Sequence, residues 1–207
     1  MGKPECRARL RPQSSNPPRP AVFLDRDGTL NIETKLLSSP AQLELLPGAA
    51  HAVRTLNRAG LLAIVVTNQA KIARGDCSES DLEQIHDKLE ALLEKEDAYL
   101  DAIYYCPHHP DGGGPGERPE LKIECDCRKP GTAMIERAAS DFSIQLEDSW
   151  LIGDTTVDLQ TAQNARIRSI LVRTGHGGQD GRWPARPDFE FDDVREAVEF
   201  VTMKAGG

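Results

Sequence analysis

The chain has 207 residues and a formal net charge of −8, from 25 Lys and Arg against 33 Asp and Glu. This length suits one domain with a sizeable core, and the acidic balance excludes a general attraction to nucleic acid or to anionic membranes. No apolar run approaches the length of a bilayer span, so we expect no membrane segment.

The first 19 residues are rich in proline and arginine and contain no apolar segment of a secretory signal. We therefore expect residues 1–19 to form a disordered tail and residues 20–207 to form a single domain. Without a signal peptide, the expected location is the reducing cytoplasm. Five cysteines are present, of which Cys6 and Cys77 are expected to be free thiols.

Apolar runs and helical periodicities alternate along the rest of the chain. The apolar runs predict strands, and apolar residues at helical spacing predict the helices between them, with Ser78 or Ser80 capping the second helix. We predict strands at 21–24, 61–67, 102–105, 150–154 and 169–172, and helices at 49–59, 78–96, 132–142, 155–165 and 194–203. This order predicts an α/β fold with a doubly wound, Rossmann-like parallel sheet.

The segment AVFLDRDGTLN, at residues 21–31, places two aspartates directly after the first predicted strand. A turn beginning at Arg26 would aim Asp25 and Asp27 at one point above the strand end. One carboxylate could then attack phosphorus while the other moves the proton of the leaving alcohol, with a hard cation between them. An isolated D-x-D sequence also occurs in solvated turns, so this interpretation depends on the other parts of the site.

Two further strand ends carry polar residues suited to phosphate chemistry. Thr67 ends the second predicted strand, and Gly153-Asp154 ends the fourth. Ligands of doubly wound sheets bind at the carboxyl ends of the strands. A hydroxyl and adjacent backbone N–H groups after Thr67 could hold phosphate oxygens.

These motifs resemble those of the haloacid-dehalogenase-type phosphohydrolases, which form an aspartyl-phosphate on the first Asp of DRDGT. The resemblance runs from about Ala21 to Thr174 and is strongest to the branch of histidinol-phosphate and heptose-bisphosphate phosphatases. It implies that Asp25 is the nucleophile and that Asp27 is the general acid and base. It also implies that Thr67 binds the phosphoryl group and that Lys129, in CRKPG, neutralises its charge.

The same resemblance implies a magnesium site. Asp25, Asp154 and the backbone carbonyl of Asp27 would hold the ion, and Asp158, in GDTTVD, would orient these ligands. Magnesium is expected because the site offers hard oxygen ligands and a substrate phosphate.

A second metal is indicated by a C-x-H and a C-x-C pair in the loop at 106–127. Thiolate and imidazole ligands at this count suit a closed, tetrahedral, structural zinc site, which chance cysteines would rarely produce. His109 could replace His108, although the family pattern favours His108. The predicted ligands are Cys106, His108, Cys125 and Cys127. The zinc would shape a long irregular loop that carries Arg128 and Lys129 into the active site.

The interval between Asp25 and Thr67 is filled by a loop, a helix and a strand, which leaves no room for a separate cap domain. We therefore expect the site to be covered only by loops, chiefly residues 31–40 and the zinc loop.

The long segment between His108 and Cys125, the IARG at 72–75 and the LVRTG at 171–175 resemble the heptose branch. The resemblance implies removal of the 7-phosphate of D-glycero-D-manno-heptose 1,7-bisphosphate. The alternative is histidinol phosphate or another small sugar phosphate. The expected partner is this small-molecule substrate, with no nucleic acid or membrane, and the expected state is a monomer.

Several positions on the leaving-group side are expected to contact the substrate. They are Glu33, Asn68, Gln69, Arg128 and Thr155. The chain departs from the usual pattern of the branch at Ala70-Lys71, at Thr155 and across residues 33–36. Lys71 could supply the charge that the branch often has as lysine at position 155.

Two other classes of protein share parts of this pattern. A non-catalytic zinc module would not need Asp25, Thr67, Lys129 or Asp154, and all four are present. A nucleic-acid end phosphatase shares D-x-D-G-T but needs a basic groove, which the acidic composition disfavours.

Overall fold

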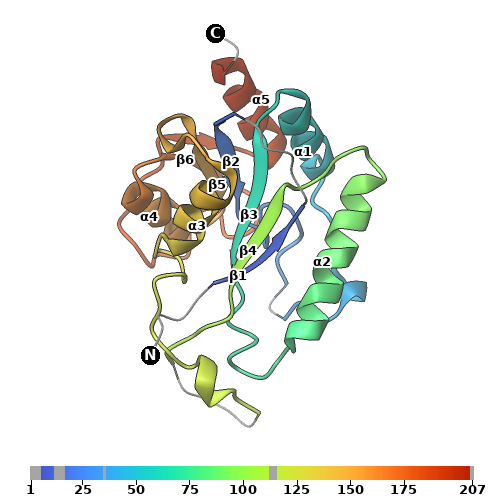
Figure 1. Ribbon diagram of the computed structural model, residues 1–207, viewed down its shortest axis with the longest axis vertical. Helices are drawn as coiled ribbons and strands as arrows, with labels where there is room; N and C mark the ends of the chain where they lie inside the picture. Colours follow the sequence, from blue (N-terminus) through green and yellow to red (C-terminus); the bar gives the residue numbers. More distant parts are fainter. Residues whose placement is uncertain (1–5, 12–16, 35, 112–115, 206–207) are drawn as a thin grey trace.

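The computed structural model describes residues 6–11, 17–34, 36–111 and 116–205. Within them, a seven-stranded sheet has the order β1-β4-β3-β2-β5-β6-β7, and helices cover both faces (Figure 1). The strands are β1 (Arg7–Leu10), β2 (Ala21–Leu24), β3 (Leu62–Asn68), β4 (Ala102–Cys106), β5 (Trp150–Gly153), β6 (Arg168–Val172) and β7 (Phe189–Phe191). The helices are α1 (Ala49–Arg58), α2 (Glu79–Glu94), α3 (Ala133–Phe142), α4 (Thr156–Ala165) and α5 (Val194–Ala205), with short 3-10 turns η1 (Pro40–Gln42), η2 (Pro119–Leu121) and η3 (Leu146–Asp148).

The predicted doubly wound α/β fold is confirmed. Strands β2 to β7 pair in parallel, and β2 lies at the centre, between β3 and β5. The chain runs outward from β2 through β3 to β4, and it later runs outward on the other side through β5 and β6. The carboxyl ends of β2 and β5 therefore flank the switch point at which such sheets bind their ligands.

Alternating side chains of β2 fill the two cores. Val22 and Leu24 belong to the core under α1, α2 and α5, whereas Ala21 and Phe23 belong to the core under α3 and α4. All four residues are fully buried, as expected for a strand covered on both faces. This burial fixes the strand that delivers Asp25 to the edge of the sheet.

The first turns of three helices are set by the residue that precedes each helix. Ser78 rather than Ser80 caps α2, and its hydroxyl accepts a hydrogen bond from the backbone N–H of Asp81. Gly48 precedes α1 with a φ of 83°, a conformation that favours glycine. Thr155 caps α4, so this helix begins beside the end of β5.

The prediction of a disordered tail over residues 1–19 is wrong for residues 7–10. They form β1, which pairs antiparallel with β4 at the edge of the sheet. Arg9 secures the strand through ion pairs with Asp87 and Glu90 of α2. The short RARL segment has no apolar periodicity, so its pairing depends on the exposed edge of β4 rather than on its own pattern.

Strand β7, at the opposite edge, was also not predicted. It is short and mostly exposed, and it pairs with β6 in the interval between the last predicted strand and the last predicted helix, for which no element was predicted. Among the described residues, no helix is long and apolar enough to cross a bilayer.

Candidate active site and metal centres

Asp25 lies at the centre of a buried charged cluster at the strand ends. Its backbone N–H donates to the carbonyl of Ile152 (2.9 Å), which ties the end of β2 to β5. Carboxylate oxygens of Asp25, Asp154 and Asp158 lie within 4.8 Å of one another. The Lys129 ammonium donates to Asp25 Oδ1 (2.8 Å) and to Asp158 Oδ1 (2.5 Å). Four predicted site residues from three separate parts of the chain therefore meet at one place.

The electrostatics of this cluster are unusual for carboxylates. Burial raises the pKa of Asp25 to about 7, with Asp158 adding to the shift and Lys129 opposing it. Burial also raises the pKa of Asp154 to about 8, helped by Asp25 and Asp158. Burial alone would lower the pKa of Lys129, but Asp158 and Asp25 raise it above its ordinary value. The cluster thus holds one fixed ammonium and three carboxyl groups that resist being ionised together.

The carboxylate cluster fits a divalent cation. Asp154 Oδ2 accepts from the backbone N–H of His176 (2.7 Å), whereas Asp154 Oδ1 is buried and has no hydrogen-bond partner among the described residues. Gly28 and Gly175 lie so close to Asp154 that a Cβ on either would come within 2.3 Å or less of Oδ2. An oxygen without a partner in a crowded acidic site is what a hard cation would satisfy.

Asp27 has the opposite surroundings. Arg26 donates to both of its oxygens (2.9 and 2.8 Å), while Asn31 and Gln69 each donate one hydrogen bond (both 3.0 Å). Burial would raise the pKa of Asp27, but Arg26, Lys71 and these hydrogen bonds lower it well below its usual range. The carboxylate of Asp27 does not join the acidic cluster, and the predicted metal contact of this residue is through its backbone carbonyl.

Arg26, whose exposed fraction is 0%, is a functional residue that the sequence analysis did not identify. Its guanidinium contacts Asp27, Gln69 Oε1 (3.2 Å) and Nε2 of the buried His86 (3.2 Å). Asn31 was missed as well. Both lie in the quoted AVFLDRDGTLN segment, Arg26 directly before Asp27 and Asn31 four residues after it, so an arginine beside the candidate aspartate was the available signal.

The three polar residues at the end of β3, Thr67 to Gln69, have different surroundings. Thr67 lines the cavity, and its hydroxyl accepts from Gln69 Nε2 (2.8 Å), which leaves the hydroxyl proton free to donate. Asn68 also lines the cavity, but its amide exchanges two hydrogen bonds with the backbone of Lys129 (2.9 and 3.1 Å). Gln69 is fully buried and bound to Asp27. Its contacts favour a positioning role over the predicted substrate contact.

A cavity of about 340 Å³ opens above these residues. Its lining includes the catalytic candidates and, besides Asn68, the predicted substrate contacts Glu33, Arg128 and Thr155. The Thr155 hydroxyl is engaged with Asp158 Oδ2 (2.5 Å). Of the segment 33–36, Lys35 lies outside the described residues.

The loops around this cavity are more numerous than predicted. Residues 31–40 and the zinc loop both contribute, as expected. Two further segments, after β3 and after β6, also line it, and of their residues the sequence analysis had placed only Ala70 and Lys71 on the leaving-group side. They supply Ala70, Lys71, Arg74, Asp76, His176, Asp180 and Arg182. Their residues have no helical or strand period, and the loop after β6 lies far from the motifs in sequence.

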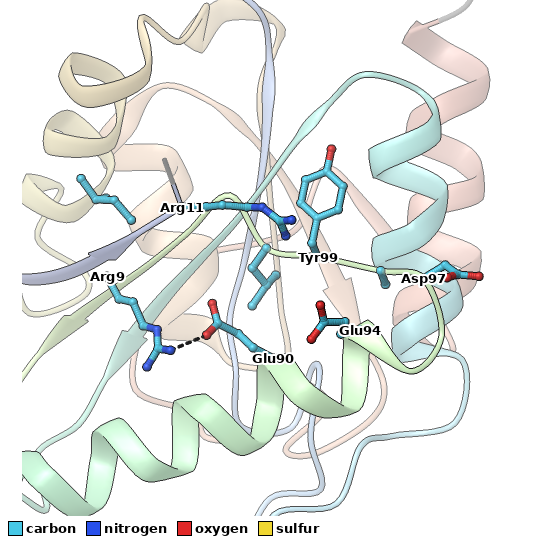
Figure 2. Close-up of a pocket in the computed structure, with 9 residues that line it drawn as sticks. Arg9, Arg11, Glu90, Glu94, Asp97 and Tyr99 are labelled. Atoms are coloured by element: carbon cyan, nitrogen blue, oxygen red, sulfur yellow. Dashed lines mark ion pairs between the residues drawn. The ribbon is translucent and has the colours of Figure 1, made fainter. Parts of the chain in front are cut away.

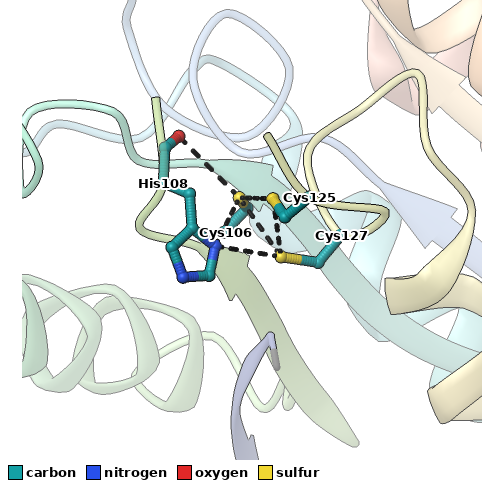
Figure 3. A group of neighbouring side chains, drawn as sticks. All are labelled: Cys106, His108, Cys125 and Cys127. Carbon is teal, nitrogen blue, oxygen red and sulfur yellow. Dashed lines mark hydrogen bonds between the residues drawn. The ribbon is translucent and has the colours of Figure 1, made fainter. Parts of the chain in front are cut away.

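The predicted zinc ligands form a compact cluster (Figure 3). The three sulfur atoms are 3.3–3.5 Å apart, too far for a disulfide and close to the edges of a tetrahedron around zinc. Nδ1 of His108 lies 3.3 Å from the sulfur of Cys127 and 3.6 Å from that of Cys106. The cluster is compatible with a closed four-ligand zinc site.

His109 does not join the cluster. Its Nε2 contacts Arg74 (3.0 Å), and its Nδ1 accepts from the backbone N–H of Asp111 (3.1 Å). Arg128 donates to the carbonyl of His108 (3.3 Å) while it lines the cavity. The cysteine cluster therefore connects directly to the residues that border the candidate active site.

A larger cavity, of about 530 Å³, lies between β1, the end of α2 and the segment before β4 (Figure 2). Its charges largely satisfy one another: Arg9 pairs with Glu90 (2.8 Å), and the Arg11 guanidinium lies 4.4 Å from the centre of the Tyr99 ring. It contains no candidate metal cluster among the described residues. Size alone does not make it the active site.

Comparison with known proteins identifies the family of the chain. The HAD-hydrolase-like family profile matches residues 126–197. A heptose-1,7-bisphosphate 7-phosphatase of Haemophilus influenzae is 40% identical over 156 residues, covering 75% of this chain and 82% of the relative. One of Thermosynechococcus vestitus is 39% identical over 195 residues, covering 89% and 96%. The chain belongs to the heptose-bisphosphate phosphatase family of HAD-like hydrolases.

A solved structure supports the same assignment. D,D-heptose 1,7-bisphosphate phosphatase from B. bronchiseptica, complexed with magnesium and phosphate, has a TM-score of 0.76 and 31% identity. The alignment covers 89% of this chain and 99% of that one. This phosphatase therefore has the fold and enzyme class that its motifs indicated.

Proposed function

We propose that this phosphatase removes the 7-phosphate of D-glycero-D-manno-heptose 1,7-bisphosphate through an aspartyl-phosphate on Asp25, with magnesium as cofactor. The observation that carries the proposal is the contrast between Asp25, paired with Lys129 beside an acidic cluster, and Asp27, fixed by Arg26. The names of the similar relatives support the substrate.

In the first half-reaction, Asp25 forms a bond to phosphorus while the bond between phosphorus and the sugar oxygen breaks. Lys129 occupies Asp25 Oδ1, so Oδ2 is the attacking oxygen. The ammonium of Lys129 stays charged and neutralises the phosphoryl group, and the Thr67 hydroxyl donates to a phosphoryl oxygen. Positioning and charge neutralisation supply most of the rate enhancement in this kind of transfer.

Asp27 gives its proton to the departing sugar oxygen and later takes a proton from the water that hydrolyses the aspartyl-phosphate. Its lowered pKa means that the carboxylate is deprotonated in the free enzyme, which is the form that accepts a proton in the second step. For the first role, the incoming phosphate places negative charge beside Asp27, which favours its protonated form. The hydrogen bonds from Asn31 and Gln69 keep the carboxyl group aimed during both steps.

The carboxylates of Asp25 and Asp154, with the backbone carbonyl of Asp27, would hold magnesium, and Asp158 would keep Lys129 in place. When bound, the ion supplies positive charge to the phosphoryl oxygens. Zinc in the Cys106–Cys127 cluster would act structurally, because four protein ligands leave no open position for a substrate.

The experiment is phosphate release from three substrates: the heptose bisphosphate, histidinol phosphate and 4-nitrophenyl phosphate. We expect the highest kcat/KM for the bisphosphate, a product that keeps its 1-phosphate by ³¹P NMR, and loss of activity when magnesium is chelated. A preference for histidinol phosphate would overturn the substrate, and activity unaffected by chelation would overturn the cofactor.

A further inference from the structure

The rim of the active-site cavity carries three arginines from three separate segments. Arg74 follows β3, Arg128 ends the zinc loop, and Arg182 belongs to the loop after β6, and all three line the cavity. Within the described part of the chain, none of them forms an ion pair with a carboxylate. Their hydrogen bonds are to neutral groups, from Arg74 to His109 and from Arg128 to the carbonyl of His108.

The loop that carries Arg182 is fastened to the beginning of α4. Asp180 accepts hydrogen bonds from the backbone N–H and the hydroxyl of Thr156 (both 2.7 Å), and the N–H of Trp183 donates to the same hydroxyl (3.1 Å). These bonds use the Asp180 carboxylate, so it caps α4 rather than pairing with Arg182. Asp180 and Trp183, which lie on either side of Gly181 and Arg182, are therefore fixed by hydrogen bonds. These bonds hold Arg182 at the rim although its side chain is exposed.

The position of Arg182 also brings it close to Arg128. Arg128 borders both the active-site cavity and a neighbouring one of about 590 Å³ that Trp183 lines. Arg182 and Arg74 each lie near enough to Arg128 for the charges to repel. Three guanidiniums in one place without a carboxylate partner are unfavourable unless a ligand brings negative charge.

The reacting phosphate does not supply this negative charge to the three arginines, because Asp25, Thr67 and Lys129 define its place deeper in the cavity. Glu33, a carboxylate of the lining, has Asp27, His176 and Lys71 as its charged neighbours rather than these arginines. A second anionic group of the same substrate would reach the rim. Bidentate contacts of guanidinium with phosphate oxygens are strong and geometrically selective.

We propose that Arg182, held by the Asp180–Thr156 hydrogen bonds, is a specificity-determining residue that binds the second phosphate of a bisphosphate substrate together with Arg74 and Arg128. This inference rests on the proposed function and adds a contact from the loop after β6. The chemical class of ligand is a sugar that carries two phosphate groups, one at the nucleophile and one at the rim.

The test compares Arg182→Ala and Arg182→Lys with Arg186→Ala, a control on another exposed arginine of the same loop that does not line the cavity. For the heptose bisphosphate, Arg182→Ala should raise KM about tenfold with a much smaller change in kcat. For the heptose 7-phosphate, which lacks the second phosphate, KM should change much less. Arg182→Lys should restore part of the affinity, and Arg186→Ala should behave as wild type.

The Asp180→Asn variant separately tests whether the hydrogen bonds between Asp180 and Thr156 position Arg182. It weakens the hydrogen bonds to Thr156, so it should shift KM in the same direction as Arg182→Ala while Arg182 itself is retained. An unchanged KM for the bisphosphate in Arg182→Ala, or equal increases for both heptose substrates, would overturn the inference. If the wild type does not hydrolyse the bisphosphate at all, the proposed function fails instead.

Discussion

Asp25 and Asp27 are two residues apart, yet the protein gives their carboxyl groups opposite environments. Asp25 shares a buried site with Asp154 and Asp158 and has a pKa raised to about 7. Asp27 is held by a buried arginine and two amides, and its pKa is lowered. The same side chain can therefore take two roles, because its neighbours rather than its chemistry decide its charge.

The two halves of the site also have different mechanical supports. The Asp25 half depends on Lys129, which is attached to the zinc loop and to Asn68. The Asp27 half depends on Arg26, which packs against α2 through His86. Substitutions in each half should consequently fail in different ways, and four predictions separate them.

The largest effect is expected from Asp25→Asn. The asparagine keeps the shape but cannot form the aspartyl-phosphate, so turnover should fall by at least about 1,000-fold on both sugar and aryl phosphates. Its melting temperature should not fall, because the change removes one negative charge from a crowded acidic cluster. The measurements are steady-state phosphate release and thermal unfolding. Turnover near that of wild type would exclude the covalent mechanism.

This first prediction has a second part, because Asp27→Asn sharpens the contrast. The amide can still accept from Arg26 but cannot transfer a proton, which contributes about 10²–10⁴-fold in such reactions. The loss should be larger for the heptose bisphosphate than for 4-nitrophenyl phosphate, whose leaving group departs without a proton. Equal losses on both substrates, as for Asp25→Asn, would show that the two carboxylates do not divide the work in this way.

The second prediction concerns the support of the Asp25 half. Cys125→Ser should abolish zinc binding, from about one ion per chain to none, and lower the melting temperature by about 10 °C, a few kcal/mol for a chain of this size. Activity should fall indirectly, since Arg128 and Lys129 follow the cluster. Cys77→Ser is the matched control, because Cys77 is a free thiol that is buried, whereas Cys125 is half-buried, and it lies outside the cluster. Metal analysis showing zinc retained in Cys125→Ser would contradict the assignment.

The sequence predicted the Asp25 half better than the Asp27 half. Asp25 and Asp154 lie in motifs at strand ends, and the order of strands was enough to bring these two together, whereas Lys129 was assigned through the family resemblance of CRKPG. The burial of Gln69 was not predicted, because it depends on how the turn after β3 folds back on Arg26. Arg182 and β1 could not be predicted, since an irregular loop and an edge strand take their positions from tertiary contacts rather than from local periodicity.

The third prediction concerns Asn68, which is one of the two supports of Lys129; the other is the zinc loop. Asn68→Ala removes both hydrogen bonds to the Lys129 backbone, so the ammonium should lose its alignment with Asp25. We expect kcat to fall by about 10- to 100-fold, since a small misplacement of a catalytic group is costly. Zinc content should stay at the wild-type value, which distinguishes this variant from Cys125→Ser. A large rise in KM without loss of kcat would instead indicate direct substrate binding by Asn68.

The smallest effect is expected from His86→Phe in the Asp27 half. His86 is fully buried, its Nδ1 has no partner in the described structure, and its ring meets that of Tyr105 edge to face. Burial lowers the pKa of His86 well below its usual value, and Arg26, Arg9 and Lys71 act in the same direction, while Asp27 opposes them. The native state therefore holds a neutral imidazole.

This lowered pKa makes stability depend on pH with a definite sign. The unfolded chain takes up a proton on His86 below about pH 6.5, and the native state does not, so wild type should lose up to about 1.4 kcal/mol per pH unit below that value. Above it, the contribution is fully present. His86→Phe cannot titrate, so its stability relative to wild type should improve between pH 7.5 and pH 5. At pH 7.5, kcat should fall only a few-fold, because Arg26 keeps its contacts with Asp27. Denaturant unfolding of both proteins at the two pH values measures the difference, and parallel losses of stability would show that His86 is protonated in the native state.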